Sequence, residues 1–173
     1  EVNELFVDML RGNSNTLGRT VEVVDQVRQD PVRIQELFGL YYQDDEWVRL
    51  RTSSVLKRLW RQDQSIIKPY IAEWVDEVSM IDQPSVQWTF VQKVDECAGL
   101  LSTEQMQIAV GRIKQYLQSS QDWIVLNTSI QALGNLAQDD TELKTWLIPQ
   151  LEIHANSSKK SVAARANKYL AKL

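Results

Sequence analysis

The side chains that could carry out acid-base, nucleophilic or metal chemistry are few in this sequence and lie far apart. His154 is the only histidine and Cys97 the only cysteine. A zinc site needs several histidine or cysteine ligands brought together, and an internal disulfide needs two cysteines. The scattered glycines form no phosphate-binding loop. The sequence therefore predicts no catalytic site, no metal site and no cofactor, and places His154 and Cys97 in or beside the core.

Charged residues are distributed unevenly along the chain. Carboxylate clusters stand at predicted helix ends or turns, where capping and solvation account for them: Asp44-Asp45-Glu46, Asp95-Glu96 and Asp139-Asp140. Two runs contain basic residues and no acid: Arg49, Arg51, Lys57, Arg58 and Arg61, and later Lys159, Lys160, Arg165, Lys168 and Lys172. These runs indicate either a binding surface or solvated helix faces.

The stretch from Asp44 to Arg61 has the spacing of an amphipathic helix. Its apolar stripe consists of Val48, Thr52, Val55, Leu56 and Leu59. Asp44 and Asp45 precede the stripe and can cap the helix start. A second stripe, made by Ile34, Leu37, Leu40 and Tyr41, comes about one helix earlier. Together they predict a unit of helix, turn and helix.

This unit recurs with a period of 38 residues. Leu37, Val75, Ile113 and Leu151 stand at that spacing. With the positions three and four residues before and after each, seventeen of twenty are apolar, against about nine expected from the composition. We therefore expect these four residues to form a buried column.

The second helix of each unit follows the same period less strictly. Its apolar positions are Val48, Thr52, Leu56 and Leu59, then Val86, Phe90, Val94 and Cys97, and later Val162, Ala166, Leu170 and Leu173. In the helix pair near residues 101–138 the same offset gives the polar residues Thr128 and Asn135. We therefore shift the register of that second helix by about two residues. The shifted set, which avoids burying unpaired polar groups, is Leu126, Ile130, Leu133 and Ala137.

The pattern predicts an all-α chain of five antiparallel helix pairs in one domain spanning residues 1–173. The pairs lie near residues 1–30, 31–62, 63–100, 101–138 and 139–173, and no linker is long enough to divide them. The first pair has an apolar face at Val2, Leu5, Phe6, Met9 and Leu10, a turn at residues 12–15, and a second face at Leu17, Val21 and Val24.

The period, the helix pairs and the segment Asp44–Thr52 resemble the HEAT and HEAT-like repeat family, over essentially the whole chain. The segment looks like the aspartate turn of that family followed by valine, arginine and a small residue. Only one pair has the Val48-Arg49 dipeptide, so a divergent bacterial HEAT-like type is the closer comparison. The resemblance implies a right-handed α-solenoid whose second helices line the concave side, with distant similarity to HEAT-like DNA glycosylases.

Composition limits the setting in which the protein works. No run approaches the ~20 apolar residues of a membrane span, and no signal segment opens the chain. We therefore expect a cytoplasmic protein without a membrane partner. The net charge of −4 does not favour a polyanion partner.

Three hypotheses for the function remain open. The first is a non-enzymatic scaffold that binds a protein segment, including an acidic one, through the second helices. We expect Leu50 and Trp88 to lie next to each other there, with Lys57 and Arg61 beside them. The second is nucleic-acid binding or repair of alkylated bases; against it, no tryptophan has an aspartate four residues later, the pairing that the glycosylase resemblance would require. The third is a chromophore-handling chaperone, which nothing in the sequence distinguishes.

Overall fold

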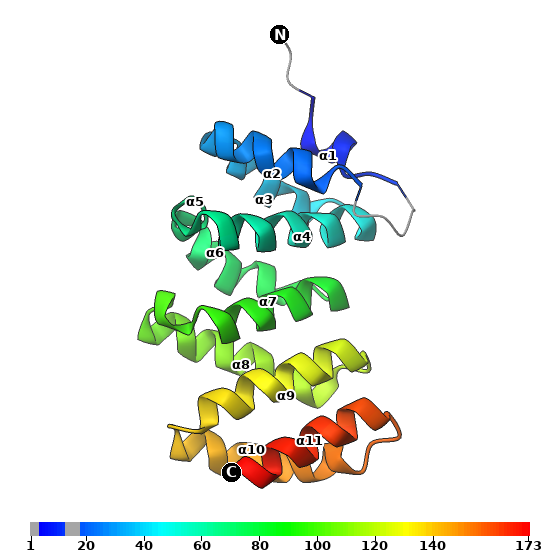
Figure 1. The fold of residues 1–173 in the computed structure, drawn as a ribbon, viewed down its shortest axis with the longest axis vertical. Helices are drawn as coiled ribbons and strands as arrows, with labels where there is room; N and C mark the ends of the chain where they lie inside the picture. Colours follow the sequence, from blue (N-terminus) through cyan, green and yellow to red (C-terminus); the bar gives the residue numbers. More distant parts are fainter. Residues whose placement is uncertain (1–3, 13–17) are drawn as a thin grey trace. The chain divides into compact units, whose positions relative to one another are not determined.

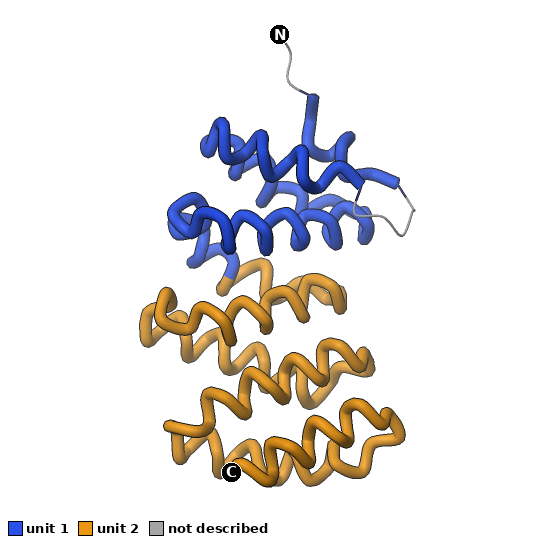
Figure 2. The backbone as a smooth tube through the Cα atoms, in the orientation of Figure 1, with its two compact units in different colours: residues 1–74 blue, residues 75–173 orange. Residues whose placement is uncertain are grey.

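The computed structural model describes residues 4–12 and 18–173, and the regular elements in these ranges are all helical (Figure 1). No strand occurs in the described ranges, which confirms the all-α class. Val2, Leu17 and the predicted turn at residues 13–15 lie outside them. Contacts divide the chain into two compact units, residues 1–74 and 75–173 (Figure 2). The prediction of a single repeat domain stays a prediction.

Unit 1 begins with short elements and contains one long helix. Its elements are α1 (Phe6–Met9), α2 (Thr20–Gln29), η1 (Pro31–Arg33), α3 (Ile34–Gly39), η2 (Leu40–Tyr42), α4 (Glu46–Gln62), α5 (Gln64–Ile67), η3 (Lys68–Tyr70) and the start of α6 (Ile71–Asp76), where η marks a 3₁₀ helix. The predicted first helices of the second and third pairs are thus broken into α and 3₁₀ segments. Pro69, which follows α5, contributes to its break because proline lacks the amide hydrogen that a helix interior needs, whereas Pro31 stands in a first turn that does not need it.

α4 forms where the sequence predicts it. The Asp45 carboxylate accepts hydrogen bonds from the backbone nitrogens of Trp47 and Val48, at 3.0 and 3.2 Å, and so caps the first turn. All five residues of the predicted apolar stripe are buried. α4 packs against α2, and Trp60 meets Trp74 edge-to-face with their ring centroids 4.9 Å apart.

The first helix pair differs from its prediction at two residues. Phe6, Met9, Leu10 and Val24 are buried as expected, but Leu5 and Val21 are each 56% exposed. α1 is only one turn long and Leu5 precedes it, so Leu5 is not on a helical face at all. In α2 the buried positions are Thr20, Val23, Val24 and Val27, which leaves Val21 on the solvent side.

Unit 2 contains the longer and more regular helices. Its elements are the end of α6, η4 (Val78–Met80), α7 (Pro84–Glu96), η5 (Ala98–Leu100), α8 (Thr103–Ser119), α9 (Trp123–Ala137), α10 (Thr141–Ala155) and α11 (Lys160–Lys172). Ser102 and Gln105 form a capping box at the start of α8, and Asp122 and Asp140 cap α9 and α10. Pro149 lies inside α10 rather than near its first turn.

The predicted column is buried at every position. Leu37 in unit 1 and Val75, Ile113 and Leu151 in unit 2 each have no exposed side-chain surface. The shifted register of α9 is also confirmed: Leu126, Ile130, Leu133 and Ala137 are all buried. In the unshifted register Ile124, Thr128 and Asn135 are not buried. Cys97, Leu170 and Leu173 are half-buried, because they lie at or beyond helix ends.

The helices of unit 2 form two layers. α9 packs against α7 on one side and α11 on the other (Figure 1). These three helices, the second helices of their predicted pairs, therefore lie side by side. α8 and α10 each pack against α9 and make little direct contact with each other. Gly134 lets α9 approach α11 closely, since a Cβ atom at that position would overlap the Tyr169 ring.

Candidate partner-binding surfaces

Three of the four predicted binding residues share one face of α4. Leu50, Lys57 and Arg61 are separated by seven and four residues, spacings that return to the same side of a helix. Leu50 and Lys57 are half-buried and Arg61 is exposed. The partly exposed Trp47, Ser54 and Arg58 lie beside them. This α4 surface therefore combines apolar and basic side chains.

Trp88 lies on α7 in unit 2 and is half-buried. It is therefore neither fully enclosed in the core nor fully available to a partner. Leu50 belongs to unit 1, so the predicted adjacency of Leu50 and Trp88 stays a prediction.

Arg51 does not belong to the basic surface that the sequence predicts. Its side chain is 1% exposed, and one terminal nitrogen donates to the backbone oxygens of Leu10 and Gly12. The guanidinium carbon also lies 5.6 Å from the centre of the Trp47 ring. Arg51 follows Val48 by three residues, a spacing that puts both on the buried face. Its charge thus ties α4 to the chain segment after α1.

A polar groove crosses the second helices of unit 2. We name it the amide groove; it has a volume of about 230 Å³ and is lined by Gln92, Asp95, Asn127, Thr128, Gln131 and Arg165. These residues come from α7, α9 and α11. The lining contains three amides and one charge of each sign, so its net charge is zero. The apolar pattern of the sequence does not predict this groove.

Hydrogen bonds between helices organise the amide groove. The Asp95 carboxylate accepts from Gln131 Nε2 at 3.3 Å and from Asn135 Nδ2 at 3.0 Å. Arg165 donates to the Gln131 side-chain oxygen, and Tyr169 donates to that of Asn135. Burial, reinforced by the Asp95 charge, raises the pKa of the Tyr169 hydroxyl.

One buried acceptor in the amide groove has no protein partner. The Asn127 side chain is only 9% exposed, and its Nδ2 donates to Ser161 Oγ at 3.1 Å. Its Oδ1 is buried without a hydrogen bond. A buried amide oxygen left without a donor is costly. The oxygen itself is inaccessible from the groove, so a ligand could donate an N–H or O–H group to it only after the Asn127 side chain rotates.

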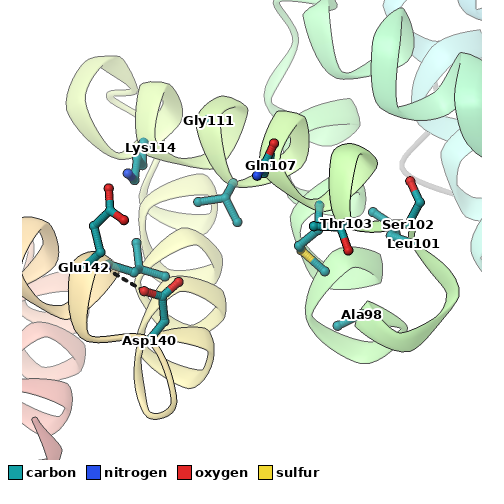
Figure 3. Close-up of a pocket in the computed structure, with 12 residues that line it drawn as sticks. Ala98, Leu101, Ser102, Thr103, Gln107, Gly111, Lys114, Asp140 and Glu142 are labelled. Atoms are coloured by element: carbon teal, nitrogen blue, oxygen red, sulfur yellow. Dashed lines mark hydrogen bonds between the residues drawn. The ribbon is translucent and has the colours of Figure 1, made fainter.

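A second and larger groove lies in the other layer of unit 2, between α8 and the start of α10 (Figure 3). Its volume is about 630 Å³. Leu101, Met106, Val110 and Leu143 provide apolar lining. We name it the α8–α10 groove. The lining also includes Gly111 and Lys114 on α8 and Glu142 on α10.

Other features predicted from the sequence have structural roles or stay predictions. His154 is half-buried, and its Nε2 lies 3.0 Å from the backbone oxygen of Leu117. Within residues 4–12 and 18–173 no group of three or more potential ligands is placed to hold a metal ion. No helix in the described part of the chain is both long enough and apolar enough to cross a membrane.

Comparisons with known proteins give no further assignment. A scan against protein-family models and searches of curated proteins and of solved structures returned no match to this chain.

Proposed function

We propose that this chain is a non-enzymatic protein-interaction module that holds a segment of a partner protein on the surface of its second helices. The observation that carries the proposal is the amide groove with its unpartnered Asn127 oxygen. The proposal includes the HEAT-like solenoid arrangement and a cytoplasmic setting predicted from the sequence.

The chemistry of the amide groove suits the main chain of an extended peptide. Each peptide unit has one donor and one acceptor, and each Asn or Gln side chain offers the same two functions. The groove is smaller than the ~300–1,000 Å³ typical of small-molecule pockets, so it suits part of a longer ligand. Its lining has no aromatic ring on which a nucleobase could stack and no net positive charge.

The α4 surface supplies a second part of the proposed interaction. Leu50 offers apolar contact, and Lys57 and Arg61 offer positive charge beside it. Apolar contact supplies affinity, and charge steers a partner of opposite sign, so we expect the bound segment to contain acidic and apolar residues. Duplex DNA would use the two cations but would hardly need Leu50.

The test begins by selecting linear peptides that bind the whole chain from a displayed library. The binding of the selected peptides to variants of the chain is then measured. Asn127→Leu removes the amide groups and keeps the side-chain size, so selected peptides should bind at least about tenfold more weakly while the melting temperature holds or rises. Asn167→Leu is the matched control, because Asn167 is exposed on α11 and does not line the groove.

Two results would contradict the proposed function. One is a set of selected peptides that bind Asn127→Leu as tightly as the unchanged chain. The other is tight, salt-sensitive binding of duplex DNA that Lys57→Glu with Arg61→Glu abolishes and Leu50→Ala leaves intact.

A further inference from the structure

The α8–α10 groove differs in shape and lining from the amide groove. Its volume of about 630 Å³ falls within the range of ligand sites. It extends along α8 from Thr103 to Lys114, which at 1.5 Å per residue is roughly 16 Å, or three helical turns. The groove is therefore long enough for a segment with regular structure.

Gly111 stands in the middle of α8 without a reason in the packing of the chain itself. A Cβ atom built there would meet nothing within 4 Å, and the residue is exposed. Glycine inside a helix lowers its stability relative to alanine. Its effect here is an open position on the groove lining, where the backbone of another element can approach α8 closely.

The lining decides which kind of segment fits. Leu101, Met106, Val110 and Leu143 present apolar side chains, and along α8 from Met106 to Lys114 the backbone groups are engaged within the helix. An extended strand lying on these side chains would lose water from its own amide and carbonyl groups without gaining partners. A helix satisfies those groups internally and can lay an apolar face on the floor.

Charge defines one end of the groove. The turn before α10 and its first residues carry Asp139, Asp140 and Glu142, all exposed. The Asp140 carboxylate also accepts from the Leu143 backbone nitrogen at 3.0 Å. Lys114 is the cation at this end, and its Nζ lies 4.8 Å from the centre of the Trp146 ring. The lining itself has two acids, Asp140 and Glu142, against one lysine, which favours a basic side chain on the occupant.

We propose that the α8–α10 groove binds an amphipathic helix of a partner protein, with the helix passing over Gly111 and a lysine or arginine of the helix facing Glu142. The α8–α10 groove lies in the layer of unit 2 that contains α8 and α10, whereas the amide groove lies across α7, α9 and α11. This interaction is independent of the proposed binding to the amide groove, and either can fail alone.

The experiment selects peptides of roughly 15 residues, about four helical turns, from a displayed library on the whole chain and discards those that also bind Gly111→Gln. Retained peptides are labelled, and their binding is measured by fluorescence anisotropy. We expect peptides to survive this counter-selection and to bind the unchanged chain at least about tenfold more tightly than Gly111→Gln, whose melting temperature should hold or rise because glutamine favours helix more than glycine does. Gly39→Gln, at an equally open helical glycine in unit 1, should bind as the unchanged chain does.

Two further measurements identify the occupant. Circular dichroism should show that the peptide gains helix on binding. Glu142→Lys should weaken binding several-fold, and a peptide with its basic residue changed to glutamate should restore it on that variant.

The proposal is overturned if no peptide depends on Gly111, or if the dependent peptides contain internal prolines and bind without gaining helix. It is also overturned if the unchanged chain dimerises by light scattering and Gly111→Gln does not, because the occupant is then a second copy of the chain.

Discussion

A substitution lowers the free energy of unfolding most when it changes a fully buried residue. Ile113 has no exposed surface and is the third of the four column residues that stand 38 residues apart. Ile113→Asp would place an unpaired carboxylate in the core of unit 2, and we expect a loss on the order of several kcal/mol in the free energy of unfolding. A thermal melt measures it. Ile153→Asp, on α10 at 66% exposure, should leave the melt nearly unchanged.

Leu50 and Trp88 are predicted to act in binding rather than in folding. Both keep part of their surface exposed, so truncation removes fewer core contacts than at Leu56 or Phe90, which are fully buried. We expect Leu50→Ala and Trp88→Ala each to weaken binding of the peptides selected in the test of the proposed function, while the melting temperature stays nearly unchanged. A large fall in melting temperature together with unchanged binding would show that these residues belong to the core.

Among the elements, two helices of unit 2 make opposite use of glycine. A Cβ atom at Gly134 on α9 would overlap the Tyr169 ring of α11, whereas one at Gly111 on α8 meets nothing. Gly134→Ala should therefore lower the free energy of unfolding by about 1–3 kcal/mol, as overpacking does. Gly111→Ala should raise it by roughly 0.5–1 kcal/mol. Urea unfolding of both variants gives the two signs, and equal signs would contradict the packing described for α9 and α11.

The sequence predicts elements well where burial repeats and less well where hydrogen bonds decide. The period locates α4, α8 and α10 because apolar spacing reports burial directly. It does not predict that the helix before α4 is divided into η1, α3 and η2, since local hydrogen-bond geometry causes that division.

The amide groove could have been found with the same period. Asp95 pairs with Gln131, 36 residues later, and Gln131 pairs with Arg165, 34 residues later. These separations are close to one repeat, so polar residues on successive second helices meet as the apolar ones do. Arg51 could not be found in this way, because its partners are backbone oxygens near the first turn.

At the scale of the whole molecule, the stability should fall at alkaline pH. Burial raises the pKa of Tyr41 in unit 1 and of Tyr116 in unit 2, and their hydroxyls contact Ser53 Oγ and donate to the Ser79 backbone oxygen respectively. In the unfolded chain both ionise near pH 10. Their contribution to stability is therefore complete below about pH 10 and is lost as pH rises toward the raised folded values.

Urea midpoints measured from neutral pH upward test this expectation. Tyr116→Phe should make the alkaline decline shallower, because one of the three tyrosines whose pKa is raised, Tyr41, Tyr116 and Tyr169, no longer titrates. A decline of unchanged slope in both Tyr116→Phe and Tyr41→Phe would assign the pH dependence to other groups.

The tryptophans provide the chain with optical probes of its two units. Trp60 and Trp74 in unit 1 are each 1% exposed and in edge-to-face contact, whereas Trp123 in unit 2 is 53% exposed. An aqueous collisional quencher should reach the emission of Trp123 and leave that of Trp60 and Trp74 largely intact. The coupled pair should also give a near-ultraviolet dichroism band that disappears when unit 1 loses its packing. Melting of unit 1 can thus be followed without any added label.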